Sequence, residues 1–324
     1  MKALFVLLLV SWMAPLRANG DLPGWPAAVT EIRVTSSKDA SAQPSLWYAP
    51  ASREPVPLLI GLHTWSGDYK QTTDTYGAPY ADWCIRNGWA FLAPNFRGPN
   101  RRPEATGSDL AVQDVIDALG AAQSRARIDP SRVFLVGTSG GGHLALLLAG
   151  RHPELWAGVS AWVPITDLAA WHADTKKKGL RYRLDIEASC GGPPGTNARV
   201  DREYRHRSPL THLAGARGRL PIDINAGIRD GHDGSVPIRH SIQAFNLLAK
   251  EEDRLSKAAT DYLVTEATVP ESLAKHYAPR LENARRVLFR HESNGARLTL
   301  FEGGHEIITK TALEWIRQVA EEKR

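Results

Sequence analysis

Three short segments of this 324-residue sequence carry a serine, a carboxylate and an imidazole, in that order. Ser139 lies in the run Gly137-Thr138-Ser139-Gly140-Gly141, which fits the pattern G-x-S-x-G. Asp230 lies in the segment 229–235, and His305 follows two glycines. A serine hydroxyl is a poor nucleophile at neutral pH, so it needs a base, and an imidazole base needs a carboxylate to orient it. Brought together, the three side chains suit nucleophilic attack on a carbonyl carbon.

The glycine-rich run around Ser139 has other interpretations. Such turns between a strand and a helix also bind phosphate, or serve only as a turn. The patterns G-x-x-x-x-G-K-[ST] and G-x-G-x-x-G are both missing, and His143 stands where a lysine would be needed. The zinc pattern H-E-x-x-H also fails, because Thr309 takes the second histidine position after His305-Glu306. The sequence therefore favours a nucleophilic serine and predicts neither a metal nor a cofactor.

The hydrophobic pattern predicts which elements position these side chains. Each of the three segments follows an apolar run that is typical of a buried strand. Helical patterns separate these runs, as in parallel βαβ units, whose strand ends form the site of an open sheet. We therefore predict an α/β fold with a mostly parallel central sheet of about eight strands and helices on both faces. The predicted strands cover 29–36, 45–48, 56–63, 89–94, 133–136, 156–164, 221–228 and 298–301.

Two segments fit this pattern less well. Residues 167–212 are rich in cations, with Lys176, Lys177 and Lys178 in a row. A solvated charged loop is the simpler interpretation, and a cap whose cations attract an acidic substrate is the alternative. Residues 251–290 are amphipathic and charge-rich, and we expect a helical excursion there. Residues 21–324 are otherwise expected to form a single domain.

The first twenty residues have the pattern of a secretory signal peptide. Lys2 precedes an apolar run over 3–13, and small residues at 18–20 fit a cleavage site. The apolar run is shorter than the ~20 residues that a spanning helix needs, so we expect a secreted or periplasmic protein. Cys84 and Cys190 could pair in such a compartment, and the sequence leaves this open. A formal net charge of only +5 gives no case for binding nucleic acid.

The chemical motifs resemble those of a known family. The run Gly137-Thr138-Ser139-Gly140-Gly141, the segment Gly227-Ile-Arg-Asp230 with Val236-Pro237 behind it, and Gly304-His305 resemble the catalytic domain of the prolyl oligopeptidase family, within the α/β-hydrolase fold. The resemblance runs from about Val56 to the C-terminus. It implies that Ser139 is the nucleophile, His305 the general base and Asp230 its orienting acid. Asp233 is the alternative acid, because it stands three residues before Val236, as the acid does in many relatives.

An oxyanion site needs two N–H donors. One is expected from the backbone of Gly140, directly after the serine. The run His63-Thr64-Trp65-Ser66-Gly67 resembles the His-Gly-aromatic turn of many esterases, which implies the backbone of Trp65 as the second donor, although Thr64 replaces the glycine. The rings of Trp65 and Trp162 are candidates for lining the substrate slot, with ordinary packing as the alternative. We expect His143 to be packed, and His232 either touches substrate or braces its turn.

The resemblance also limits the reaction. Peptidases of this family are generally much longer and carry an N-terminal β-propeller, for which residues 21–55 leave no room. We therefore expect a secreted hydrolase of carboxylic esters, acting on a small-molecule or polysaccharide-linked ester such as an acetyl or feruloyl group. A serine peptidase or amidase is the alternative. A binding module on an inactive scaffold is disfavoured, because all three triad positions are filled.

Overall fold

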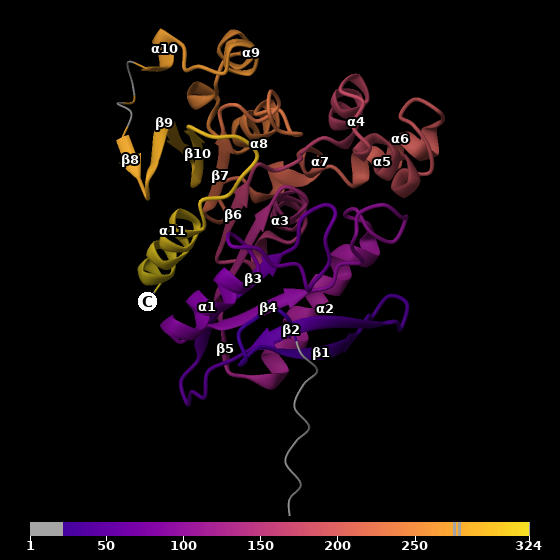
Figure 1. The fold of residues 1–324 in the computed structure, drawn as a ribbon, viewed down its shortest axis with the longest axis vertical. Coiled ribbons are helices and arrows are strands. Elements are labelled where there is room, and N and C mark those ends of the chain that lie inside the picture. The colour runs from indigo at the N-terminus through magenta and orange to yellow at the C-terminus, as the bar shows by residue number, and fades with distance from the viewer. Residues whose placement is uncertain (1–21, 275–276, 278–279, 324) are drawn as a thin grey trace, which may run out of the picture.

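A computed structural model of the chain describes residues 22–274, 277 and 280–323. Within these residues, ten strands form one sheet in the order β1-β2-β4-β3-β5-β6-β7-β10-β9-β8 (Figure 1). The strands from β4 to β10 in this order are parallel, and the strands at both edges pair antiparallel. The strands are β1 (Thr30–Thr35), β2 (Ala42–Tyr48), β3 (Val56–Leu62), β4 (Ala90–Pro94), β5 (Ile128–Thr138), β6 (Gly158–Trp162), β7 (Ile222–Gly227), β8 (Arg280–Glu282), β9 (Arg285–Ser293) and β10 (Ala296–Phe301).

This sheet confirms the predicted architecture and corrects the number of strands. All eight predicted strands are present, and β8 and β9 are additional. β8 and the first part of β9 lie in 251–290, where the helical expectation holds for a short 3₁₀ turn (Glu251–Asp253), α9 (Lys257–Glu266) and α10 (Glu271–Ala274). The physical reason is a two-residue hairpin turn at Asn294-Gly295, where both residues have positive φ and fold β9 back onto β10.

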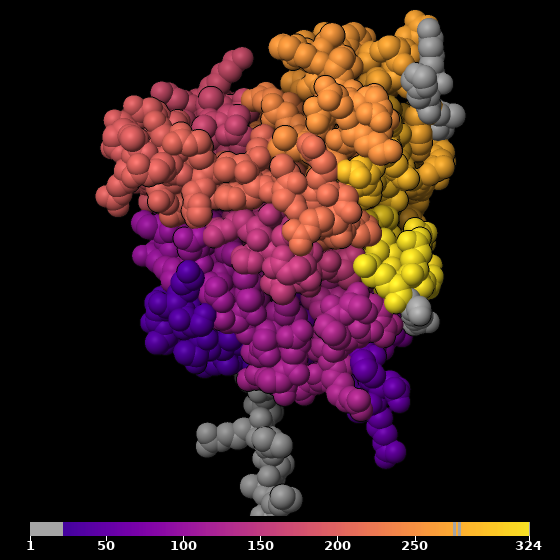
Figure 2. All heavy atoms as spheres, turned by 180° about the vertical axis from the view of Figure 1, so that it is seen from behind, coloured from indigo at the N-terminus to yellow at the C-terminus, as the bar shows by residue number. Residues whose placement is uncertain are grey.

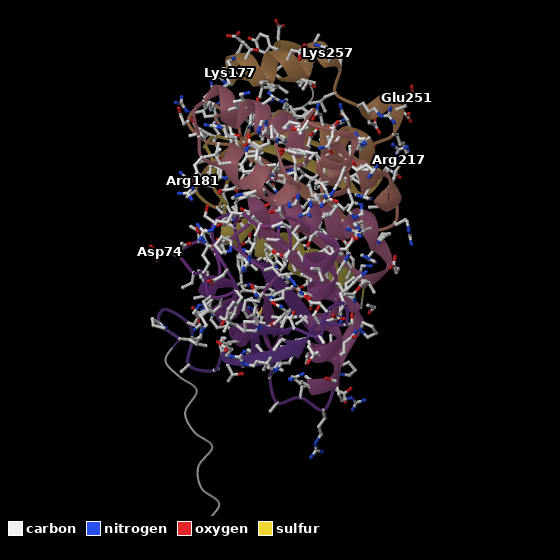
Figure 3. All side chains as sticks on the ribbon, turned by 90° about the vertical axis from the view of Figure 1, so that its right-hand side faces the viewer. Asp74, Lys177, Arg181, Arg217, Glu251 and Lys257 are labelled. Carbon is white, nitrogen blue, oxygen red and sulfur yellow. The ribbon has the colours of Figure 1, made fainter. Side chains whose placement is uncertain are left out.

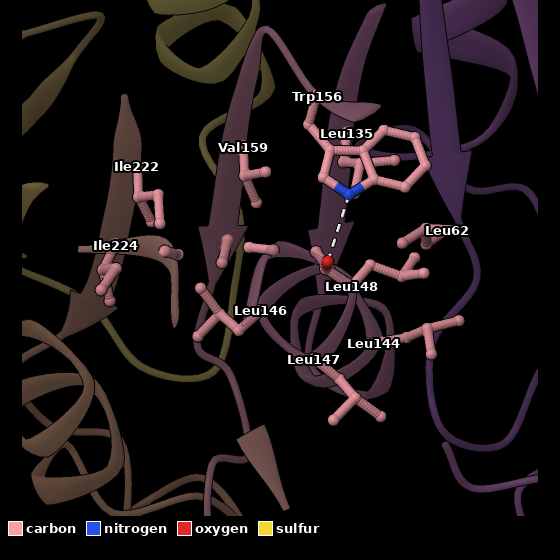
Figure 4. Close-up of a cluster of buried hydrophobic side chains, with 14 of the residues drawn as sticks. Leu62, Leu135, Leu144, Leu146, Leu147, Leu148, Trp156, Val159, Ile222 and Ile224 are labelled. Atoms are coloured by element: carbon pink, nitrogen blue, oxygen red, sulfur yellow. Dashed lines mark hydrogen bonds between the residues drawn. The ribbon is translucent and has the colours of Figure 1, made fainter. Parts of the chain in front are cut away.

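Helices cover the two faces of the sheet. On one face lie α1 (Ala78–Asn87) and α11 (Thr309–Glu322), and on the other lie α2 (Asp109–Arg125), α3 (Gly140–Arg151) and α8 (Arg239–Leu248), each face with its own buried apolar cluster. Figure 4 shows the leucines of α3 in one buried cluster with side chains of the sheet, with Leu146 on the side of β6 and β7. Because α3 is buried on this face, the start of the helix directly after Ser139 is held firmly at the end of the sheet.

The segment 167–212 is a helical cap that packs around a small apolar core shared with neighbouring loops. It forms α4 (Leu168–Lys177), α5 (Tyr182–Cys190), α6 (Ala198–His206) and α7 (Pro209–His212). In the space-filling view these helices form a lobe on one side of the molecule (Figure 2). A buried cluster inside the lobe includes Trp171 of α4 together with Trp65 and Val236 from two loops at the sheet edge. The simpler expectation of a solvated loop is therefore wrong for this segment.

Three other expectations concern the ends and the cysteines. The signal peptide at residues 1–20 lies outside the described residues. In the part of the chain that the structure describes, no helix is long and apolar enough to cross a bilayer. Cys84 and Cys190 are both buried and both free, so they do not form the disulfide that the sequence left open. Burial raises the pKa of the Cys190 thiol to about 12, which keeps it uncharged.

Candidate active site

Ser139 lies in a sharp turn between β5 and α3. Its φ is 58° and its ψ is −115°, a conformation that a residue with a side chain rarely adopts. Two backbone hydrogen bonds hold this turn: the Ser139 N–H donates to the Trp162 carbonyl at 2.8 Å, and the His143 N–H donates to the Ser139 carbonyl at 2.8 Å. The side chain is thereby presented at the carboxyl edge of the parallel strands, as the G-x-S-x-G pattern predicts.

The three predicted side chains meet at this edge. Ser139 Oγ lies 2.8 Å from Nε2 of His305, and Nδ1 of His305 lies 2.7 Å from Oδ2 of Asp230. The other oxygen of Asp230, Oδ1, accepts the N–H of Val236 at 3.1 Å. The Asp230 side chain is only 1% exposed, and Ser139 is 8% exposed. The chain of hydrogen bonds therefore runs from a buried carboxylate to a hydroxyl near the surface, which is the order that activation of a serine requires.

The structure distinguishes the two candidate acids. Asp233 points away from His305 and pairs with Arg229, with 2.6 Å between Oδ2 and the Arg229 Nε, and its side chain is 56% exposed. We call residues 229–236 the acid loop. Within it, Gly234 lies so close to the triad that a Cβ there would be 2.1 Å from Asp230 Oδ1 and 2.8 Å from the His305 Cβ. Only glycine fits this position, and only Asp230 faces the imidazole.

The two candidate oxyanion donors lie next to each other. A Cβ on Gly140 would be 2.4 Å from the backbone N of Trp65, so the start of α3 and the loop after β3 are in close contact. We call residues 63–67 the oxyanion loop. The first N–H groups of a helix have no partner within the helix, which leaves the Gly140 N–H available to an anion. The structure thus brings together the two backbone groups that the sequence predicts.

The oxyanion loop keeps its shape although Thr64 replaces the expected glycine. Gln71 Oε1 accepts both the N–H of Thr64, at 3.0 Å, and its hydroxyl, at 2.9 Å. The Trp65 carbonyl accepts the N–H of Asn100 at 2.9 Å. No pattern in the sequence marks Gln71 for this role, because its contact depends on how the segment after the loop folds back.

The aromatic candidates differ from expectation. Trp162 is 1% exposed, packs 5.6 Å from the Phe301 ring and donates its indole N–H to Ser160 Oγ at 2.9 Å, so its predicted place beside the substrate is wrong. Its position at the end of β6 turns the side chain into the core of the α1 and α11 face. The Trp65 ring is also buried, where it packs against the Trp171 ring at 4.7 Å. Ordinary packing therefore accounts for both rings.

Three further histidines make packing or hydrogen-bond contacts within the fold. His143 is buried, and its Nε2 lies 2.8 Å from the Arg207 carbonyl, as expected for a packed residue. His232 places its Nε2 2.8 Å from the Val264 carbonyl, so it braces the acid loop against α9. His63 is stacked on Phe96 with 3.5 Å between ring centroids. Burial lowers the pKa of both His63 and His143 to about 4, which keeps these two rings neutral at ordinary pH.

Metal ligands are not gathered at this site. Among the described residues, no group of three histidine, cysteine or acidic side chains is arranged to hold a metal ion.

The sheet, the sharp turn at Ser139 and the order of the three side chains define the class of α/β-hydrolase proteins. The model of the prolyl oligopeptidase family matches residues 80–263, which is more than half of the chain, and the chain belongs to this family. The resemblance inferred from the motifs is thus confirmed.

Several known proteins are similar to this chain. A putative esterase, NocK, from Nocardia uniformis subsp. tsuyamanensis is 34% identical over 35% of this chain and 34% of its own length. Acylamino-acid-releasing enzyme 2 of Oryza sativa subsp. japonica is 26% identical over 67% of this chain and 28% of its own length. The match thus spans about a third of each curated relative. The solved structure of an acetyl xylan esterase from Paenibacillus sp. R4 has a TM-score of 0.57 and 16% identity, over 91% of this chain and 84% of that one, and shows the same fold.

Proposed function

We propose that this protein is a serine hydrolase that cleaves carboxylic esters through an acyl-enzyme formed on Ser139. The observation that carries this proposal is the unbroken chain of hydrogen bonds from Ser139 Oγ through both ring nitrogens of His305 to Asp230. Beside it lie the adjacent backbones of Gly140 and Trp65, which supply donors for a developing oxyanion.

The reaction follows from these positions. Ser139 Oγ attacks the ester carbonyl carbon while its proton moves to Nε2 of His305, and the buried Asp230 stabilises the imidazolium that forms. The carbonyl oxygen becomes an oxyanion, which accepts hydrogen bonds from the two backbone N–H groups. When the tetrahedral intermediate collapses, the proton passes from His305 to the leaving alcohol. A water molecule then attacks the acyl-enzyme by the same route, which releases the acid and restores Ser139.

The relatives support an ester substrate and keep an amide substrate as the second candidate. The names of similar proteins include an esterase and an acetyl xylan esterase, which agree with the acetyl or feruloyl esters of polysaccharide proposed from the sequence. The peptidase alternative is favoured by one observation: the acylamino-acid-releasing enzyme aligns with 67% of this chain, a larger share than the esterase does. Secretion or export to the periplasm remains a proposal that rests on residues 1–20.

A panel of substrates tests the proposal. The purified protein is assayed with p-nitrophenyl esters of increasing acyl length, acetylated and feruloylated oligosaccharides, and acylamino-acid and aminoacyl p-nitroanilides. We expect a higher kcat/KM for the esters than for the anilides, and a loss of about 10⁵-fold or more in Ser139→Ala. Faster cleavage of anilides would establish the peptidase alternative. Equal activity of the parent and Ser139→Ala would show that the hydrolysis does not arise at this site.

A further inference from the structure

Trp171, on α4 of the cap, contacts both loops that complete the candidate site. Its indole Nε1–H donates to the Ser235 carbonyl in the acid loop at 2.8 Å. Its ring packs edge-on against the ring of Trp65 in the oxyanion loop, with 4.7 Å between centroids and 73° between planes. The side chain is fully buried, and Tyr182 of α5 packs on its ring at 5.1 Å. The indole therefore has a fixed position between the two loops.

The bond to Ser235 leads directly to the triad. The Ser235 carbonyl and the Val236 N–H belong to the same peptide unit, and that N–H donates to Asp230 Oδ1 at 3.1 Å. The peptide plane thus receives a hydrogen bond from Trp171 on one side and gives one to Asp230 on the other. A carbonyl that accepts a hydrogen bond polarises its own peptide group and makes the N–H a better donor. The indole of Trp171 consequently fixes the direction of the N–H that orients the carboxylate.

Two more residues of the same cap segment hold the acid loop and the helix that follows it. The Lys178 ammonium, just after α4, donates to the carbonyls of Gly231 and Gly234, the latter at 3.0 Å. Asp174 pairs with Arg239, at the start of the helix that follows the acid loop. Positions 171, 174 and 178 have the spacing of one helix face, so this face of the cap is turned to the acid loop. Lys178 belongs to the run of three lysines for which attraction of an acidic substrate was considered. Its ammonium instead binds backbone carbonyls of the acid loop.

We propose that Trp171 is a positioning residue for the candidate triad: through the Ser235–Val236 peptide it holds Asp230 against His305, and through its ring it sets the oxyanion loop. Lys178 supports the same arrangement by holding the acid loop on the far side of that peptide. This inference rests on the proposed function, because a positioned triad matters only if Ser139 reacts. It assigns the cap a part in assembling the site.

Trp171→Phe tests the hydrogen bond with little change in packing. Phenylalanine keeps an aromatic ring against Trp65 and removes the indole N–H. The matched control is Trp156→Phe, because Trp156 is also buried and donates its Nε1–H to a backbone carbonyl, that of Leu148, at the far end of α3 (Figure 4). We expect Trp171→Phe to lower kcat about tenfold with KM changed less than about twofold, since misplacement of a catalytic group acts on the transition state. Trp156→Phe should lower the free energy of unfolding about as much as Trp171→Phe does, and its kcat should equal that of the parent.

Lys178 provides a second, independent variant. Lys178→Met removes the ammonium and keeps the length of the side chain, and Lys178→Arg restores donors. Lys177→Met is the control, because Lys177 is exposed on the same helix and projects from the surface of the molecule (Figure 3). We expect kcat to fall in Lys178→Met, to recover at least partly in Lys178→Arg and to stay at the parent value in Lys177→Met.

Two readouts separate this inference from the proposed function. The rate at which a fluorophosphonate labels Ser139 reports activation of the serine whatever the natural substrate is, and amide hydrogen exchange over 229–236 reports the acid loop without any reaction. Slower labelling and faster exchange in Trp171→Phe and Lys178→Met, but in neither control, support the inference. Unchanged labelling and exchange in both variants would overturn it while the ester assay still stands. Absence of labelling in the parent would overturn the proposed function, and with it the role of Trp171 in catalysis.

Discussion

Asp230 and Asp233 have chemically identical side chains, but their surroundings give them different roles. Asp230 is buried, with one oxygen on the Val236 N–H and the other on His305. Asp233 is exposed and pairs with Arg229 at the surface. An exposed ion pair contributes little to stability, because water screens it, whereas a buried carboxylate next to an imidazole stabilises the positive charge that forms there during proton transfer.

Asp230→Asn should therefore lower kcat by about 10⁴-fold, because an amide fails to stabilise the imidazolium and favours the wrong tautomer of His305. Asp233→Asn should keep kcat/KM within about twofold of the parent. Steady-state rates on the best ester of the panel, at one pH, measure both effects. A severe loss in Asp233→Asn together with a mild one in Asp230→Asn would reverse the assignment.

At the scale of single residues, the sequence predicts the groups that belong to a spaced motif and misses those that depend on long-range contacts. Ser139, Asp230 and His305 were found because each follows a strand, and the ends of parallel strands share one edge. Trp162 also ends a strand, yet its ring turns into the core. Trp171 was missed because its partner Ser235 lies 64 residues further along the chain. Nothing local in the sequence signals such a bond.

The turn that joins β5 to α3 stores backbone strain. Ser139 holds a φ of 58° and a ψ of −115°, which costs a residue with a Cβ about 1–3 kcal/mol and costs glycine far less. The surrounding elements impose this conformation, since the end of β5 is buried within the sheet and α3 is buried against one of its faces.

Ser139→Gly should consequently raise the free energy of unfolding by about 1 kcal/mol relative to Ser139→Ala, because alanine keeps the strain that glycine relieves. Both variants lack the hydroxyl, so the loss of its bond to His305 cancels in the comparison. Urea unfolding followed by tryptophan fluorescence measures the difference. A Ser139→Ala variant at least as stable as Ser139→Gly would argue against stored strain at this turn.

At the scale of elements, two local patterns in the sequence predict elements that the structure contains. The high charge of the same regions favoured other interpretations. Asn294-Gly295 is a typical hairpin turn, and it separates β9 from β10, but the many charged residues of 251–290 favoured a helix. In the cap, Asp167 and Asn197 each accept two backbone N–H groups at a helix start. Asp and Asn are among the best residues for this position, so two of the four helices of 167–212, α4 and α6, were predictable from their caps.

On the scale of the whole molecule, the buried histidines link stability to pH. His63 and His143 are neutral in the folded protein, and burial lowers their pKa from the ordinary 6.5 to about 4. In the unfolded chain these rings gain protons once the pH falls below about 6.5, while in the folded protein they do so only near pH 4. The unfolded state therefore binds more protons in this range, and stability decreases as the pH falls through it.

We expect the free energy of unfolding to decrease between about pH 6.5 and about pH 4 by up to about 3 kcal/mol for each of these histidines. His143→Gln removes one titrating ring and retains a donor for the Arg207 carbonyl, so its stability should depend less steeply on pH. Urea unfolding at several pH values across the range measures both slopes. Parallel curves for the parent and the variant would contradict the assignment of a buried neutral ring.

The overall architecture was largely predictable, because it depends on patterns that repeat along the chain. The eight strands that were expected include all of those that position the triad, and both faces carry helices as predicted. The packing of the cap helices was the part that local patterns did not determine. The cap's apolar residues find their partners in Trp65 and Val236, which lie far from it in the sequence.

The shared core of the cap has a consequence for anyone who wishes to re-engineer this scaffold. Removal of residues 167–212 would expose the apolar side chains of Trp65 and Val236 and would also remove the hydrogen bond from Trp171 to the acid loop. The cap is therefore not an independent unit, and its removal would disrupt both the acid loop and the oxyanion loop.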